Sequence, residues 1–215
     1  MTRVVACALA LLLAAEPAAA GPLSELIFAP GAEAGAVPEL SYAHERRMPE
    51  GLPEDAALPK PVSDEVLTLA RTGGEAPRRA LMRQGPGEAA PAPVSEFPLS
   101  GPDPVLLFFL ESTARNMAAL TGGSPFYIRN RIREALGQAD LGTEVMAGDR
   151  PARQVVLHPF AADPHRASMG AFGELALVLV LEAGAEPPRF LSLSADTAVA
   201  EGGYHESLTL MAEDG

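Results

Sequence analysis

The sequence is short of cysteine, lysine and aromatic residues. Its 215 residues include one cysteine, Cys7, and one lysine, Lys60, and no tryptophan. Beyond Cys7 the chain can therefore form no disulfide and carries no thiol nucleophile. The shortage of aromatic side chains argues against a site built on stacked sugars or bases. The formal net charge of -12 argues against a nucleic-acid partner, because such binding needs a basic surface that neutralises phosphates.

The local motifs of common catalytic sites are also missing. The chain contains no G-x-S-x-G, no S-x-x-K and no H-E-x-x-H. It also lacks the glycine-rich loops that hold nucleotide phosphates ahead of a helix. The sequence therefore predicts no cofactor and gives no local sign of an enzyme.

The first twenty residues, MTRVVACALALLLAAEPAAA, have the pattern of a signal peptide. Arg3 supplies the positive start, and residues 4–15 form an apolar run that is too short to span a bilayer. Ala18 and Ala20 give the small-x-small site after which a signal peptidase cuts. We therefore expect residues 1–20 to be removed and the protein to be soluble, in the periplasm or secreted. No later run approaches the ~20 apolar residues of a membrane span, so the mature chain is expected to have no transmembrane segment.

The rest of the chain predicts a flexible N-terminal arm at residues 21–36 and a single α+β domain at residues 37–215. Short runs of alternating apolar and polar residues predict a series of strands on either side of a helical region. The run ELALVLVLEAG is apolar on both faces, which predicts the central strand of the sheet, covered on both sides. The last three strand patterns follow one another in meander order.

A helix hairpin is predicted at about residues 104–138. Asp103-Pro104 and Ser124-Pro125 each combine a capping side chain with a proline at the first helical position, and Gly122-Gly123 separates the two helices. The first helix is apolar almost all round, and Phe108 falls on the face that should be wet. Burial between layers is one interpretation. The other is that Val105 and Phe108 line a cavity for an apolar ligand.

The second helix carries Arg129, Arg131 and Arg133 within five residues. Arg129 and Arg133 are four apart, where like charges repel on a helix. Carboxylates of the same domain would relieve that repulsion, and this is the interpretation we favour. The alternative is that Arg129 and Arg133 bind an anion from outside through their guanidinium groups.

The histidines offer weaker candidates. His158, Asp163 and His165 lie close together in one loop, but their spacing matches no standard metal site, and Asp163 is better explained as a helix cap. No metal site is predicted.

The pairs His44-Glu45 and His205-Glu206 lie on strands, where neighbours point to opposite faces. Neither pair can therefore act together locally, and we expect these to be ordinary polar residues of strands.

These observations predict an α+β fold with a meandering antiparallel sheet packed against a central two-helix hairpin. This arrangement broadly resembles the folds of periplasmic lipid and lipoprotein carriers, a likeness of architecture that assigns no role to any residue. The first hypothesis is an exported, non-catalytic binding or accessory protein for an apolar or amphipathic molecule or an envelope protein. Its ligand-binding residues would be Val105, Phe108, Arg129 and Arg133. The alternative is an envelope hydrolase with a dispersed His/Asp site, and a purely structural envelope protein also stays open.

Overall fold

The computed structural model describes residues 21–28, 39–52, 58–73, 77–185, 189–197 and 202–212. The expected signal peptide, residues 1–20, and residues 29–36 of the expected arm lie outside these ranges.

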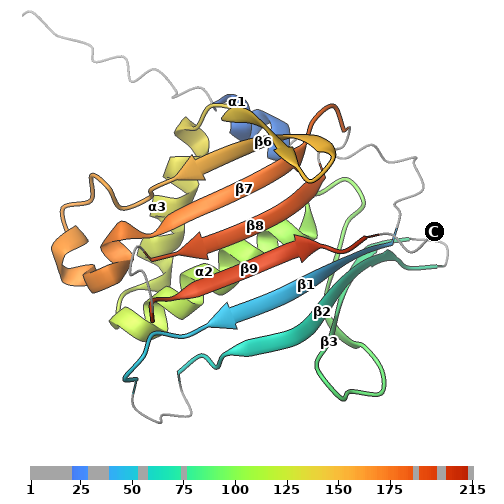
Figure 1. Cartoon of the computed structure of the whole chain (residues 1–215), viewed down its shortest axis with the longest axis horizontal. Coiled ribbons are helices and arrows are strands. Elements are labelled where there is room, and N and C mark those ends of the chain that lie inside the picture. The colour runs from blue at the N-terminus through green and yellow to red at the C-terminus, as the bar shows by residue number, and fades with distance from the viewer. Residues whose placement is uncertain are drawn as a thin grey trace, which may run out of the picture.

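Nine strands form one antiparallel sheet in the order β4-β3-β2-β1-β9-β8-β7-β6-β5 (Figure 1). The strands are β1 (Leu40–Arg47), β2 (Val62–Arg71), β3 (Arg79–Gln84), β4 (Ala92–Phe97), β5 (Thr143–Ala147), β6 (Arg150–Leu157), β7 (Ala176–Glu182), β8 (Phe190–Asp196) and β9 (His205–Leu210). The chain thus builds one half of the sheet outward from β1 and the other half inward from β5 to β9. The two halves join where the first strand pairs with the last, so that Tyr42 lies opposite Leu210.

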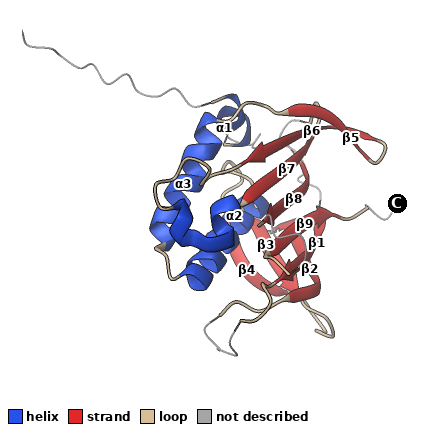
Figure 2. Ribbon diagram, turned by 60° about the vertical axis from the view of Figure 1, so that its left-hand side comes forward, coloured by secondary structure: helices blue, strands red, loops and turns tan. Residues whose placement is uncertain are grey.

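The predicted α+β class and the two-helix hairpin are confirmed. Helices α2 (Pro104–Thr121) and α3 (Pro125–Gln138) pack against each other and lie on one side of the curved sheet (Figure 2). The carboxylate of Asp103 accepts hydrogen bonds from the N–H groups of Val105 and Leu106, at 2.7 and 3.1 Å. Gly122 ends α2 with a φ of 69°, a left-handed conformation that glycine adopts without strain. The caps that were visible in the sequence therefore set both ends of α2, and Ser124 sets the start of α3.

The core lies between the helices and the inner face of the sheet. Phe109 and Met117 of α2 and Ile128, Ile132 and Leu136 of α3 are buried there. They belong to one continuous apolar cluster that also takes in inward-facing leucines of β7. The helices therefore seal one face of the sheet by apolar burial.

The position predicted for the doubly apolar strand is wrong. That strand is β7, which lies third from one edge of the sheet, and the central strand is β9. Leu177 and Leu179 of β7 are buried, but Val178 and Val180 on its other face are only half-buried. The helices cover one face of the sheet (Figures 1 and 2), so apolar residues on both faces did not mark a strand that is buried on both.

The expectation of a flexible arm is also wrong for residues 21–28. Helix α1 (Pro22–Ile27) buries Leu23 and Ile27, which lie four residues apart on one helix face. The N–H of Gly21 donates to the carbonyl of Gly137 at the end of α3, at 2.7 Å. A composition rich in glycine, alanine and proline did not reveal a helix held by two apolar side chains.

None of the helices in the described ranges has the length and apolar character needed to cross a bilayer.

Candidate functional site

The centre of the candidate site is Glu206, a fully buried carboxylate on β9. Its Oε2 accepts hydrogen bonds from the hydroxyl of Tyr204, at 2.6 Å, and from the amide of Asn116, at 3.3 Å. Its Oε1 accepts from the hydroxyl of Ser112, at 2.7 Å, and from the guanidinium of Arg46, whose Nη2 lies 2.7 Å away. A buried carboxylate needs such partners because an unpaired charge is costly in a low-dielectric interior.

His44 of β1 lies between two carboxylates. Its Nδ1 is 2.7 Å from Oε1 of Glu65 on β2, and its Nε2 is 3.0 Å from Oε1 of Glu206. Burial would lower the pKa of His44, but the hydrogen bonds to Glu206 and Glu65 outweigh it, and the pKa is raised above its ordinary value. The geometry therefore favours an imidazolium that donates from both ring nitrogens.

The same contacts keep Glu206 ionised. Burial would raise the pKa of Glu206, but the hydrogen bond from His44, the charge of Arg46 and the hydroxyls of Ser112 and Tyr204 lower it to about 2. The cluster is therefore an internally neutralised set of charges. Every buried side-chain nitrogen and oxygen in the described residues has a hydrogen-bond partner.

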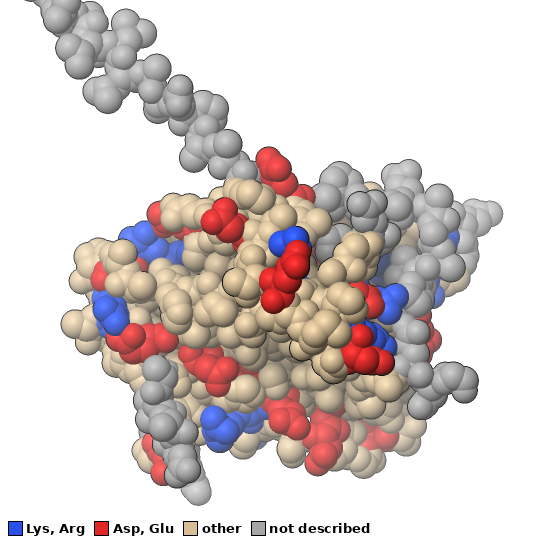
Figure 3. Space-filling view, turned by 45° about the horizontal axis from the view of Figure 1, so that its top comes forward, with Lys and Arg blue, Asp and Glu red and all other residues tan. Residues whose placement is uncertain are grey.

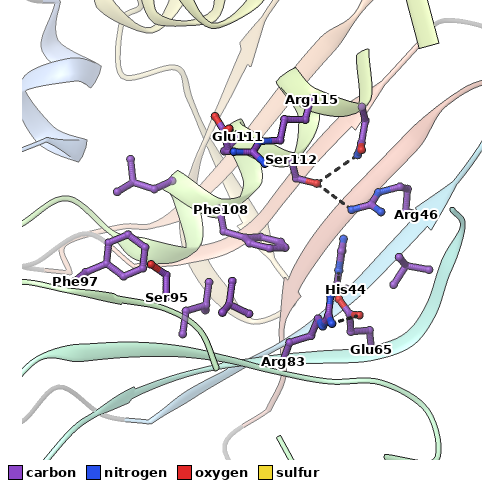
Figure 4. A pocket seen from close by; sticks show the side chains of 15 residues that line it. His44, Arg46, Glu65, Arg83, Ser95, Phe97, Phe108, Glu111, Ser112 and Arg115 are labelled. Carbon is purple, nitrogen blue, oxygen red and sulfur yellow. Dashed lines mark hydrogen bonds and ion pairs between the residues drawn. The ribbon is translucent and has the colours of Figure 1, made fainter. Parts of the chain in front are cut away.

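A pocket of about 680 Å³ lies above this cluster, between α2 and the inner face of β1–β4 (Figure 4). Its charged and polar lining includes His44, Arg46, Glu65, Arg83, Ser95, Glu111, Ser112, Arg115 and Asn116. Its apolar lining consists of Val62, Leu81, Val94, Phe97, Leu107 and Phe108. The pocket has the size and the mixed lining that are typical of small-molecule sites.

Phe108 and Val105 have different places, although both were predicted to line a ligand site. Phe108 lines the pocket, and its ring stands edge-on to that of His44 with 5.6 Å between their centroids. Val105 is 0% exposed and belongs to the core, so the prediction that it lines a cavity for a ligand is wrong. On this helix Val105 lies one residue before the core residue Leu106, on the turn that packs inward.

The arginine helix binds carboxylates of the same domain at two of its three arginines. Arg129 donates to both oxygens of Glu111 on α2, at 2.6 and 2.7 Å. Arg131 pairs with Glu134 and with the buried carboxylate of Asp163. The favoured interpretation therefore holds for Arg129 and extends to Arg131.

For Arg133 the favoured interpretation is wrong. Its guanidinium donates to the side-chain amide oxygen of Asn130, at 2.6 Å, and the residue is exposed. Neither Arg129 nor Arg133 is among the residues that line the pocket.

The loop histidines do not form a site with Asp163. His158 and His165 are exposed, whereas the carboxylate of Asp163 accepts from the hydroxyl of Tyr127, at 2.8 Å, and from the N–H of His165. Burial opposes ionisation, but these hydrogen bonds and the charge of Arg131 hold the pKa of Asp163 below its ordinary value. Within the described ranges, no three His, Cys, Asp or Glu side chains are grouped so that they could hold a metal ion.

The sequence did not predict the His44–Glu206 pair, although it did contain a signal. His44 shares a face of β1 with Leu40 and Tyr42, and Glu206 shares a face of β9 with Leu208. A charged residue at an inward position of an apolar face predicts a buried partner. The partner itself could not be found locally, because 162 residues separate the two in the chain.

The chain matches no protein-family model, no curated protein and no solved structure.

Proposed function

We propose that the protein is an exported, non-catalytic binding protein, and that its ligand is an apolar or amphipathic small molecule held between α2 and β1–β4. The observation that carries this proposal is the pocket of about 680 Å³, with apolar walls above a neutralised charged floor. Pockets for small molecules usually enclose about 300–1,000 Å³ and combine apolar walls with a few polar groups. Phe108, which the sequence placed on a wet face, belongs to those walls.

The charged floor supports binding more than catalysis. A nucleophilic serine needs a base within hydrogen-bond reach, but Ser112 donates to Glu206 instead of to a histidine. His44 uses both ring nitrogens for carboxylates, so neither is left to accept a proton from a substrate. At the loop of the hydrolase alternative, Asp163 is already engaged by Tyr127 and Arg131.

The surface charge is in keeping with the expectation that nucleic acid is not the partner. On the face that Figure 3 shows, acidic and basic side chains lie interspersed and the acidic ones spread widely over it. Binding to a phosphate backbone usually relies on a continuous basic surface.

The binding proposal is tested with the neutral apolar dye 1-N-phenylnaphthylamine. We expect saturable binding with enhanced fluorescence, and we expect Phe108→Ala to weaken it strongly while the protein stays folded. Phe126→Ala is the matched control, because Phe126 is 70% exposed on α3 and does not line the pocket. Equal loss of dye binding in both variants, or no saturable binding by the unmodified protein, would contradict the proposal.

Export is tested separately. N-terminal sequencing of the protein from the envelope of its host should begin at Gly21 or within a few residues of it. Full-length chain in the cytosol would contradict the proposed location but not the binding function. Native mass spectrometry of the same material should reveal a retained small molecule.

A further inference from the structure

We propose that the ligand of this pocket is an amphipathic anion, whose carboxylate or phosphate head binds the two most exposed guanidiniums that line the pocket, those of Arg83 and Arg115. This inference rests on the proposed function and adds the chemical class and the orientation of the ligand.

The first support is a local surplus of positive charge. Eight ionisable side chains line the pocket, form its floor or pair with its lining: the cations of His44, Arg46, Arg83, Arg115 and Arg129 and the carboxylates of Glu65, Glu111 and Glu206. With His44 protonated, five positive charges face three negative ones. The surplus of two contrasts with the formal net charge of -12 for the whole chain. A concave site that carries charge of one sign attracts ligands of the opposite sign.

Arg83 is one of the guanidiniums of the pocket lining that share a carboxylate with another cation. Its side chain is 52% exposed, and its ionic partner in the structure is Glu65, at 3.7 Å from Nε. The other oxygen of Glu65 is taken by His44, at 2.7 Å. One carboxylate therefore serves two cations, and the guanidinium of Arg83 has capacity for a second acceptor.

Arg115 repeats this arrangement on the facing helix. Its side chain is 71% exposed and pairs with Glu111, four residues earlier on α2. Arg129 binds both oxygens of the same carboxylate. The hydrogen bonds from Arg129 act against the burial of Glu111 and, together with those from Arg115, lower its pKa. Here too, one carboxylate is shared by two cations, and the guanidinium of Arg115 is more exposed than that of Arg129.

The second support is the polarity of the pocket along its length. In the view of Figure 4, Phe97 lies at one end, His44, Arg46 and Arg83 lie toward the other, and Phe108 lies between them. Along β2 and β3, the inward-facing side chains also change from apolar to charged toward the same end of the pocket. On β3, Leu81 is followed two residues later by Arg83, and on β2, Leu67 is preceded by Glu65. A molecule with an apolar tail and an anionic head matches this gradient, because its head would supply the second acceptor that the guanidinium of Arg83 can take.

The experiment compares three ligands that share a twelve-carbon chain: dodecanoate, dodecyl phosphate and dodecanol. Each displaces 1-N-phenylnaphthylamine from the full mature protein at pH 7, below its critical micelle concentration. We expect at least one of the anions to displace the dye at a concentration about tenfold lower than dodecanol does, the factor that one charge-assisted hydrogen bond provides. The anion that displaces the dye at the lower concentration identifies the preferred head group as carboxylate or phosphate.

The matched variants assign the effect to the two guanidiniums. Arg83→Gln with Arg115→Gln should bring the anions to parity with dodecanol and leave dodecanol itself unchanged. The control is Arg153→Gln with Arg166→Gln, because both of these arginines pair with carboxylates and neither lines the pocket. Arg83→Lys with Arg115→Lys keeps the charge and should retain part of the preference.

The possible failures are distinguishable. If none of the three ligands displaces the dye, the proposed binding function is overturned together with this inference. If dodecanol competes as well as the anions do, or if the double glutamine variant keeps their advantage, the inference about the head is overturned and the binding function stands.

Discussion

The two ends of the sheet use the same topology for different purposes. At the β7–β8 end, successive inward positions such as Leu177, Leu179 and Leu193 are all apolar, and they are buried against the helices. At the β1–β3 end, the inward positions change from apolar to charged, and a pocket lies above them. Helix α2 contacts both halves of the sheet, through β3 and β8. The difference therefore shows that the side chains at a few inward positions decide whether this layer closes or leaves a site.

The substitution with the largest expected effect is Glu206→Gln, which tests whether Glu206 stabilises the charged cluster around His44 and Arg46. Glu206→Gln removes the buried counter-charge of Arg46 and one of the two carboxylates that hold His44, which should lower the free energy of unfolding by about 3–5 kcal/mol. The corresponding fall in Tm is on the order of 10 °C. The control is Glu144→Gln, whose side chain is 82% exposed and pairs with Arg153, and which should cost less than about 1 kcal/mol. Urea denaturation of the unmodified protein and the two variants measures the loss of free energy of unfolding in each variant. Similar losses in the two variants would show that Glu206 does not specially stabilise the charged end.

Two neighbouring phenylalanines of α2 sharpen the contrast between sealed and open packing. Phe109→Ala removes a fully buried ring and should cost about 3–5 kcal/mol. Phe108→Ala removes a ring that lines the pocket, and should cost clearly less because no closed cavity is left behind. Denaturation midpoints for the pair check this. Equal costs would mean that Phe108 is core and that the pocket is closed in solution.

The charged end should also make stability depend on pH. Glu206 has a pKa lowered to about 2, so its contribution is present above the ordinary glutamate pKa of about 4.3 and is lost as the pH falls toward 2. His44 has a raised pKa, so its contribution is complete below about 6.5 and is lost as the pH rises through the folded value. Stability should therefore be greatest between about pH 5 and 6.5, with Tm changing on either side by several degrees in order of magnitude.

Thermal melts across the pH range check this expectation. His44→Gln should remove much of the decline above pH 6.5, whereas the control His205→Gln, one residue before Glu206 on the adjacent strand β9 and paired with Asp196, should retain it. If Tm still declines above pH 6.5 in His44→Gln, a group other than His44 causes the decline.

The smallest predicted effect separates two arginines of α3. Arg129 binds Glu111 through two hydrogen bonds, whereas within the described residues exposed Arg133 donates its side-chain hydrogen bond to the amide oxygen of Asn130. Arg129→Ala should therefore lower Tm by more than Arg133→Ala, which should leave it almost unchanged. A larger effect of Arg133→Ala would indicate a partner for Arg133 that the structure does not show.

The sequence predicted the helix hairpin well because its signals are local. Asp103, Ser124 and the glycines between them mark the helix ends within a few residues of each other. The strands were also visible as alternating patterns. Their order was not, because the pairing of β1 with β9 joins the two ends of the domain, and nothing in a single strand specifies its partner.

The candidate site was largely invisible for the same reason. Phe108 was identified because it contradicts the pattern of its own helix. His44 and Glu206 meet only across the β1–β9 pairing, and each was therefore read as an ordinary strand residue. Helix α1 was missed because it is only six residues long and just two of its residues, Leu23 and Ile27, are fully buried.

The contact between Gly21 and Gly137 gives the proposed processing step a structural consequence. Cleavage after Ala20 would convert the Gly21 amide, whose nitrogen lies 2.7 Å from the Gly137 carbonyl, into an ammonium at the negative end of the α3 dipole. Maturation would then strengthen the attachment of α1, by roughly 0.3–1 kcal/mol. A chain that begins at Gly21 should melt above one that carries an extra methionine before it, at low salt and neutral pH. Because the contact favours the charged amine, the advantage should fade as the amine loses its proton in alkali. Until the leader is removed, this contact would keep the strength of an ordinary amide hydrogen bond.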